Sequence, residues 1–456
     1  MIYLYQIGRL EPNVLNRKSL KFLIDGKEFQ NELSSFALKD FFKENAKHLP
    51  EAKPNASNVK SILIYPVSLP LNRSLIKNNI EADEFQKALK SIIENPVEYI
   101  KNPEEFFKIH PHTNKSDDFI VIHSIGEFEK YVFEGSFDDI VLEIFIDLVE
   151  RYFKEGMKEL YIDISSGLNI YVSALLEAIR HFSIFQNLGS WKEPLSVKLV
   201  FSEPIIGSSK SNFKIFKDYE LKFKVFFSSP ITMADVNNFE LSRKIAKQDR
   251  TLKNKIQEML EKFALSYSAI KNNTPLVLYS FKFDEEEEIK DLILQVVANL
   301  KDKFYLDWQK SPNLEKNEYL KLFLALSFYM GIIRILKENS VNYSDCVCLD
   351  KIKEKFSSIY QQFELNLNEQ LLNHEISNLT RHDKETGETI IDKAKEEWQS
   401  LSEFIPGEGD FQQRNFIAHA GFERTVTEVK KIGNEIYLRY KNNSLEKIED
   451  ALMKAF

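Results

Sequence analysis

The segment Glu159–Asn169, ELYIDISSGLN, decides the fold class of the first half of the chain. Its first six residues, Glu159–Ile164, are mostly apolar, as in a buried strand. A turn of small residues follows, and apolar residues then recur at three- and four-residue spacing over Leu168–Phe185, which predicts a helix. A strand that passes through a tight turn into a helix is the repeating unit of a parallel sheet covered by helices.

The same strand pattern recurs before residue 230. Further strands are predicted at Ile2–Ile7, Ser61–Pro66, Asp118–Ser124, Ser196–Phe201 and Tyr219–Phe227. Helical spacing separates most of them, most clearly at Phe137–Phe153, and Asp25-Gly26 predicts the tight turn of a small hairpin. Alternating strands and helices predict an α/β domain with a mainly parallel, Rossmann-like sheet.

The pattern changes near residue 230. Strand signals are almost absent from Pro230 until Glu435–Tyr440. Helices are predicted at residues 234–270, 286–304, 314–337, 349–375 and 387–403, and a last helix begins near Phe411. The expected fold class is therefore α/β plus all-α. We expect residues 1–230 to form the α/β domain, 231–300 a helical connector and 301–456 a second, helical domain.

Composition and charge exclude several classes of protein. With 456 residues, 43% hydrophobic and 29% charged, the chain is long enough for two or three folded domains. The net charge of −8 means that any contact with nucleic acid is local. Cys346 and Cys348 are too few for a disulfide framework or a zinc site and are expected to be reduced and structural. We find no apolar run of membrane-spanning length and no signal peptide, so we expect a cytoplasmic protein.

The turns after four predicted strands carry small or hydrogen-bonding residues. Because ligands of doubly wound sheets bind at the carboxyl ends of the strands, these turns predict one pocket. The turn of Ser165, Ser166 and Gly167 exposes backbone N–H groups, and the following helix start adds partial positive charge that favours a phosphate. Asn169 can hydrogen-bond a base or ribose, and Asp163 is expected to fix the turn. The other predicted pocket residues are Gly8, Arg9, Ser68, Ser124, Ile125 and Gly126.

A structural explanation of the same turn stays open. Ser165 or Ser166 can be a helix cap and Gly167 a turn residue with no ligand at all. The chain contains neither the glycine-rich dinucleotide fingerprint nor a P-loop, so ordinary dinucleotide binding and P-loop hydrolysis lose support.

The second motif is Arg414–His419, RNFIAH, near the C-terminus. Histidine can transfer protons near neutral pH, and arginine can bind a phosphate and stabilise its charge in the transition state, so the pair suits phosphodiester cleavage without metal. Residues five apart lie about 140° apart on an ideal helix. The pair can converge only if Arg414 begins the helix or if two copies of the chain face each other. The alternative is an exposed arginine beside a capping or core histidine.

Other histidines give no metal site. His110 and His112 lie in a proline-containing loop with no third ligand nearby in sequence, and we expect a surface loop there. His123 ends a predicted strand at the pocket, and we interpret it as a strand residue with satisfied hydrogen bonds rather than a ligand contact.

Together the two motifs resemble the CARF–HEPN ribonucleases, ancillary effectors of type III CRISPR systems (the Csx/Csm group). Their N-terminal Rossmann-like CARF domain carries a strand followed by an Asp-x-Ser/Thr-x-Gly-x-Asn-type turn, which corresponds to Asp163–Asn169 here. Their C-terminal helical HEPN domain carries Arg, four to six residues, then His, which corresponds to Arg414 and His419. The order and size of the domains also agree, so the resemblance covers nearly the whole chain.

The resemblance implies a cyclic-oligoadenylate-activated endoribonuclease in antiviral defence. The activator, which we expect to be cyclic tetra-adenylate, binds a CARF dimer and raises the activity of a HEPN dimer. The HEPN pair cleaves single-stranded RNA without metal or another cofactor and leaves a 2′,3′-cyclic phosphate. His419 is assigned to proton transfer, Arg414 to phosphate binding and Asn415 to orienting RNA. A homodimer, or a higher homo-oligomer built from dimers, is implied, and no membrane partner is expected.

Two other classes of protein remain as alternatives. The first is a non-catalytic nucleotide sensor whose second half is an interaction or DNA-binding bundle, although the acidic run Asp284–Glu288 and the net charge disfavour binding to DNA. The second is an α/β nucleotide-dependent enzyme with a helical cap, which lacks both nucleotide fingerprints.

Overall fold

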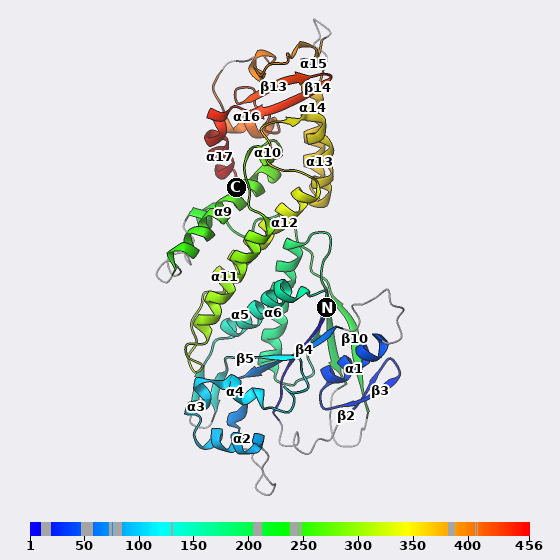
Figure 1. Ribbon diagram of the computed structural model, residues 1–456, viewed down its shortest axis with the longest axis vertical. Helices are drawn as coiled ribbons and strands as arrows, with labels where there is room; N and C mark the ends of the chain where they lie inside the picture. Colours follow the sequence, from blue (N-terminus) through cyan, green and yellow to red (C-terminus); the bar gives the residue numbers. More distant parts are fainter. Residues whose placement is uncertain are drawn as a thin grey trace. The chain divides into compact units, whose positions relative to one another are not determined.

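Contacts divide the computed structural model into two compact units. It describes residues 1–10, 20–46, 58–72, 75, 84–128, 131–203, 212–237, 245, 249–381, 388–405, 407 and 409–456. The first unit comprises Met1–Ile184, Pro194–Phe223 and Val296–Lys316, and the second Phe185–Glu193, Lys224–Gln295 and Asn317–Phe456 (Figure 1). The units are defined by contacts alone, so the functional boundaries at residues 230 and 300 stay predictions.

An eight-stranded sheet forms the centre of the first unit, in the order β3-β2-β10-β9-β8-β1-β4-β5. Five neighbouring strands are parallel: β9 (Ser196–Ser202), β8 (Glu159–Asp163), β1 (Ile2–Ile7), β4 (Val59–Pro66) and β5 (Asp118–Ile122). This confirms the Rossmann-like, mainly parallel sheet that the sequence predicts.

The other edge of this sheet is extended by a hairpin and one long strand. Strands β2 (Leu20–Ile24) and β3 (Lys27–Asn31) are joined at Asp25-Gly26, where both residues have positive φ, which confirms the predicted tight turn. Strand β10 is Asn212–Leu221, not Tyr219–Phe227. It runs antiparallel to β9 and ends where Leu221 faces Val197, because β9 begins at Ser196 and offers no partner further on.

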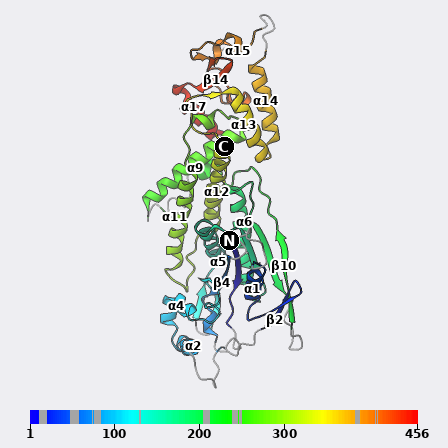
Figure 2. The same cartoon turned by 45° about the vertical axis from the view of Figure 1, so that its right-hand side comes forward.

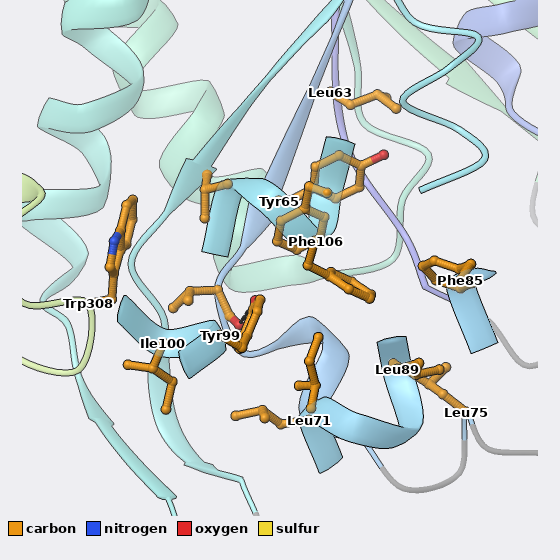
Figure 3. Packing of buried hydrophobic residues seen from close by; sticks show 14 of the residues in the cluster. Leu63, Tyr65, Leu71, Leu75, Phe85, Leu89, Tyr99, Ile100, Phe106 and Trp308 are labelled. Atoms are coloured by element: carbon orange, nitrogen blue, oxygen red, sulfur yellow. Dashed lines mark hydrogen bonds between the residues drawn. The ribbon is translucent and has the colours of Figure 1, made fainter. Parts of the chain in front are cut away.

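Helices cover both faces of the sheet (Figure 1 and Figure 2). Along β1, Ile2 and Leu4 pack in one core cluster with residues of α1 (Ser34–Ala46), whereas the Tyr5 hydroxyl points to Asp147 of α5 on the opposite face. A second cluster joins β4 to α2, α3 and α4 through Tyr65, Phe85, Tyr99 and Phe106 (Figure 3). The helices and turns of this part are α2 (Glu84–Glu94), α3 (Val97–Lys101), α4 (Pro103–Lys108), α5 (Phe137–Arg151), α6 (Asn169–Gly189), η3 (Leu69–Leu71) and η5 (Tyr152–Gly156).

The second unit is mainly helical, as predicted. Its helices are α7 (Met233–Asn237), α9 (Arg250–Lys271), α10 (Val277–Ser280), α13 (Leu349–Gln362), α14 (Asn366–Leu379), α15 (Ile390–Lys393), α16 (Gln413–Ala418) and α17 (Leu445–Lys454). Two longer helices, α11 (Glu286–Phe304) and α12 (Lys316–Glu338), begin in one unit and end in the other.

Three details of the second half differ from the sequence prediction. The helix expected at 349–375 is broken after Gln362, where Glu364 has a φ of +58°. The helix expected at 387–403 is only α15, followed by β12 (Gln399–Ser400) and the 3-10 turn η6 (Leu401–Glu403). A small antiparallel sheet of order β11-β14-β13-β12 was not predicted apart from β14. Its other strands are β11 (Val347–Cys348) and β13 (Thr427–Ile432), with β14 at Glu435–Tyr440 before the turn η7 (Asn442–Ser444).

Helix α12 corrects the prediction that no apolar segment reaches membrane-spanning length. Its length and hydropathy satisfy that criterion, yet 83% of the qualifying window is buried within the protein. Buried apolar helices of this length also form the cores of globular domains. We therefore interpret α12 as a core helix of the part of the chain that the structure describes.

Candidate functional sites

The predicted pocket residues of the first unit follow the carboxyl ends of neighbouring strands. Gly8 follows β1, Ser68 lies two residues after β4, and Ser124 lies two residues after β5. The backbone N–H of Ser68 donates to Ser124 Oγ at 2.9 Å. The Arg9 guanidinium donates to the carbonyl oxygen of Ser165, after β8. The first hydrogen bond joins the turn after β4 to the turn after β5, and the second joins the turn after β1 to the turn after β8. All four turns lie along one edge of the sheet.

The turn after β8 is held by its own hydroxyl and carboxyl groups. Asp163 is buried and accepts hydrogen bonds from Ser34 Oγ and from the Ser165 N–H, the latter at 2.9 Å, as predicted. Burial raises the pKa of Asp163, and these hydrogen bonds act in the opposite direction. Ser165 Oγ accepts from the Ser202 N–H at 2.9 Å, and Ser166 Oγ from the Leu168 N–H at 3.4 Å. Both serine hydroxyls therefore contribute to the structure of the turn.

The open part of this edge lies at Gly167 and Asn169. Gly167 has a φ of +76°, and a Cβ built on it would meet no heavy atom within 4 Å. Asn169 is exposed at the start of α6. These two residues can contact a ligand without displacing a structural hydrogen bond, unlike the serine hydroxyls.

Three other predicted pocket residues have different surroundings. Gly8 is buried, and a Cβ there would lie 2.2 Å from Cε1 of Tyr65, so this glycine permits close packing inside the sheet. Ile125 and Gly126 begin β6 (Ile125–Phe128), which pairs with β7 (Tyr131–Glu134). The Ile125 N–H donates to the Tyr171 hydroxyl of α6 at 3.4 Å, and Gly126 is exposed with a φ of +114°.

The loop with His110 and His112 is buried, which contradicts the expected surface loop. The exposed fraction is 0% for His110 and 3% for His112. His110 Nδ1 lies 3.2 Å from the Tyr65 hydroxyl, and its ring packs against Phe85. Aromatic packing holds this segment inward despite its polar sequence. Burial lowers the pKa of His112 to about 4, so it is neutral at physiological pH.

His123 forms a buried charged cluster beside Ser124. Its Nδ1 lies 2.6 Å from Glu143 Oε1, and its Nε2 lies 3.0 Å from the carbonyl oxygen of Asp307. Its ring stacks on Trp308. Burial lowers the pKa of His123, but Glu143 and the other partners outweigh this effect and raise it to about 9. The hydrogen bonds of His123 are satisfied, as expected, but the residue lies just after β5 rather than within the predicted strand Asp118–Ser124.

This cluster predicts a pH-dependent contribution to stability. The folded pKa of His123 exceeds the unfolded value of 6.5, so the stabilisation is complete below pH 6.5 and is lost as pH rises through 9. The full contribution is about 3 kcal/mol. We expect the difference in unfolding free energy between wild type and His123→Gln, measured in urea, to shrink steadily from pH 6.5 to 9.5. A difference that is constant over this range would show that His123 does not carry this charge.

The motif in the second unit lies on the short helix α16 and the turn that follows it. Phe416 is fully buried and packs against Tyr440, which anchors α16 to the small sheet. The Gly421 N–H donates to the Phe416 carbonyl oxygen at 2.8 Å, with Gly421 at a φ of +79°. A Cβ at Gly421 would lie 2.8 Å from the Tyr440 hydroxyl oxygen. This packing fixes the backbone on both sides of His419.

The three predicted catalytic residues are all exposed around α16. Arg414 is the second residue of the helix, Asn415 the third, and His419 follows its last residue. Arg414 thus lies at the helix start, one of the two arrangements in which the pair can converge. His419 Nδ1 lies 3.1 Å from Glu375 Oε2 on α14. Glu375 was not predicted as a site residue, because it lies 44 residues from His419 in sequence and no spacing pattern connects the two.

No metal site accompanies either motif in the described part of the chain. Its His, Cys, Asp and Glu side chains include no group of three or more placed to hold a metal ion. The exposed side chains around α16 supply an imidazole, a guanidinium and an amide. These groups fit proton transfer and phosphate binding.

Comparisons with known proteins agree with this two-part arrangement. Residues 2–204 match the family model described as "CRISPR system endoribonuclease Csx1, CARF domain". Residues 365–442 match "CRISPR system endoribonuclease Csx1, HEPN domain". A protein of Methanocaldococcus jannaschii named CRISPR system endoribonuclease Csx1 is 24% identical in an alignment of 409 residues that covers 81% of each chain.

A nucleotide-sensing α/β domain followed by a helical domain with the Arg–His motif defines a CARF–HEPN protein. The chain belongs to the CRISPR-associated CARF–HEPN ribonucleases, because both domains match and the order is the same. It is therefore a CRISPR-associated endoribonuclease, whose substrate is RNA.

Proposed function

We propose that this protein is a metal-independent endoribonuclease that cleaves single-stranded RNA when a cyclic oligoadenylate binds its CARF domain. Its role is antiviral defence in type III CRISPR systems, and we place it in the cytoplasm. The observation that carries the proposal is the exposed Arg414, Asn415 and His419 around α16, with the backbone fixed on both sides of His419. The edge at Gly167 and Asn169 supports the sensing part.

In the proposed reaction, His419 removes the proton from an RNA 2′-hydroxyl, and the oxygen attacks the adjacent phosphorus. Arg414 binds the phosphate and stabilises the charge that develops on it. The bond to the 5′-oxygen breaks, and this oxygen takes a proton from a protonated histidine. The products are a 2′,3′-cyclic phosphate and a 5′-hydroxyl. Asn415 orients the RNA.

The site is proposed to be completed by a second copy of the chain. A base and an acid are both needed in this reaction, and two facing α16 helices supply two histidines. The exposed positions of Arg414 and His419 are compatible with such a composite site. The protein is accordingly proposed to act as a homodimer or as a higher homo-oligomer built from dimers.

The activator site is proposed at the carboxyl edge of the CARF sheet, with cyclic tetra-adenylate as the activator. Gly167 and Asn169 form its open part, and the start of α6 favours a phosphate. Arg9, Ser68, Ser124, Ser165 and Ser166 support the turns, and Gly126 lies on the exposed side of β6. The predicted connector, residues 231–300, is proposed to transmit binding to the HEPN domain.

Calorimetric titration with cyclic tetra-adenylate tests the sensing part. We expect saturable binding by the wild type, and at least tenfold weaker binding by Asn169→Ala, which removes an exposed amide without altering a structural hydrogen bond. Linear tetra-adenylate is the control ligand and is expected to bind more weakly. If the wild type does not bind the ring, the proposed activator is wrong. If it binds the ring tightly but never cleaves RNA, the non-catalytic sensor is the better description.

A further inference from the structure

Glu375 is the carboxylate that contacts the proposed catalytic histidine. It lies on α14, and its Oε2 is 3.1 Å from His419 Nδ1. The side chain of Glu375 is 18% exposed and that of His419 57% exposed. The nitrogen on the other side of the ring, Nε2, is not engaged by a contact that the described residues make. The contact therefore occupies one of the two ring nitrogens of His419.

Helix α14 holds this carboxylate in place. Leu372 and Ile376 are buried on either side of Glu375 in sequence, which fixes the rotation of the helix. Asn368 Nδ2 donates to the Ile270 carbonyl oxygen at 2.8 Å and ties the start of α14 to the end of α9. His419 is likewise fixed by the packing of α16. Two independently anchored elements thus bring the carboxylate and the imidazole together.

Stability alone does not account for this pair. Exposed ion pairs contribute about 0–1 kcal/mol, and a histidine that is more than half exposed gains little from one. The contact instead affects the orientation and the tautomer of the His419 ring. A neutral imidazole carries one N–H, and the group that accepts from Nδ1–H decides that the lone pair lies on Nε2.

We propose that Glu375 is a positioning residue for His419. Its carboxylate accepts the Nδ1–H, fixes the tautomer and the ring plane, and leaves the Nε2 lone pair to take the proton from the RNA 2′-hydroxyl. When Nε2 is protonated, the same carboxylate stabilises the positive ring by charge. This inference rests on the proposed function of His419 and adds a residue that acts through it.

Steady-state RNA cleavage with cyclic tetra-adenylate tests the role of Glu375. We expect Glu375→Gln and Glu375→Leu to lower kcat by about 10- to 100-fold, the usual cost of losing a residue that orients a functional histidine. The KM for RNA, the half-saturating activator concentration and the Tm are expected to stay at wild-type values. Glu369→Gln is the matched control, because Glu369 lies on the same helix and contacts Gln361 instead.

The outcomes separate this inference from the proposed function. A wild-type kcat in either Glu375 variant overturns the positioning role, and so does a loss that appears in KM or in Tm rather than in kcat. His419→Ala is measured in parallel. If His419→Ala is inactive while both Glu375 variants are fully active, only the Glu375 inference fails. If His419→Ala cleaves RNA as fast as the wild type, the proposed catalytic role of His419 is wrong, and the role of Glu375 that rests on it is wrong as well.

Discussion

His419→Ala is expected to lower the rate of RNA cleavage by the activated enzyme by about 10²- to 10⁴-fold, the range that general acid–base catalysis contributes. The imidazole is exposed beside a fixed backbone, so its loss should not affect folding. The activator should bind the variant as tightly as the wild type. The measurement is single-turnover cleavage of a fluorescent RNA at saturating cyclic tetra-adenylate.

His374→Ala is the control for this experiment. His374 is an exposed histidine on α14, next to Glu375, and we assign it no role in proton transfer. We expect His374→Ala to retain wild-type cleavage. Equal rates of cleavage by His419→Ala and wild type would remove His419 from the mechanism, regardless of the rate measured for His374→Ala.

The second large effect is expected in the stability of the CARF domain. Arg151 and Asp147 form a buried ion pair on α5, with side chains 9% and 6% exposed and Nε to Oδ1 at 3.0 Å. Tyr5 donates to the same carboxylate at 2.6 Å. Arg151→Met leaves the Asp147 charge buried without its arginine partner. Breaking a buried pair in this way costs about 3–5 kcal/mol.

The matched control is an exposed arginine pair in the same domain. Arg180 lies on α6, contacts Glu177 and is 49% exposed, so Arg180→Met should cost less than about 1 kcal/mol. The measurement is the free energy of unfolding in urea, monitored by a spectroscopic signal that comes from the CARF domain. If Arg151→Met destabilises the domain no more than Arg180→Met does, the buried network does not contribute as the structure indicates.

Much of the fold follows from local sequence patterns. The strand Glu159–Asp163 and the helix after it were predicted, because alternation of secondary structure and apolar spacing are local properties. The end of β10 was missed, because it depends on where its partner strand β9 begins. The strand β13, TEVKKI, was missed because it is short and half polar, and only its pairing with β14 makes it a strand.

The candidate sites likewise contain features that local sequence predicts and features that depend on distant segments. The exposed positions of Arg414 and His419 agree with a motif read from six consecutive residues. The burial of His110 and His112 was not predictable, because it is caused by aromatic side chains from distant segments. Glu375 was missed for the same reason, since a contact between two helices leaves no mark on the spacing within either.

We propose that a ligand bound by the CARF domain turns on metal-free RNA cleavage by the HEPN domain. The most direct measurement is cleavage of a fluorescent single-stranded RNA in EDTA, with and without cyclic tetra-adenylate. We predict slow cleavage without the ring, and an increase of at least tenfold with it that leaves 2′,3′-cyclic phosphate ends. Cleavage that needs a divalent metal, or that is unchanged by the ring while the ring is bound, would contradict this account.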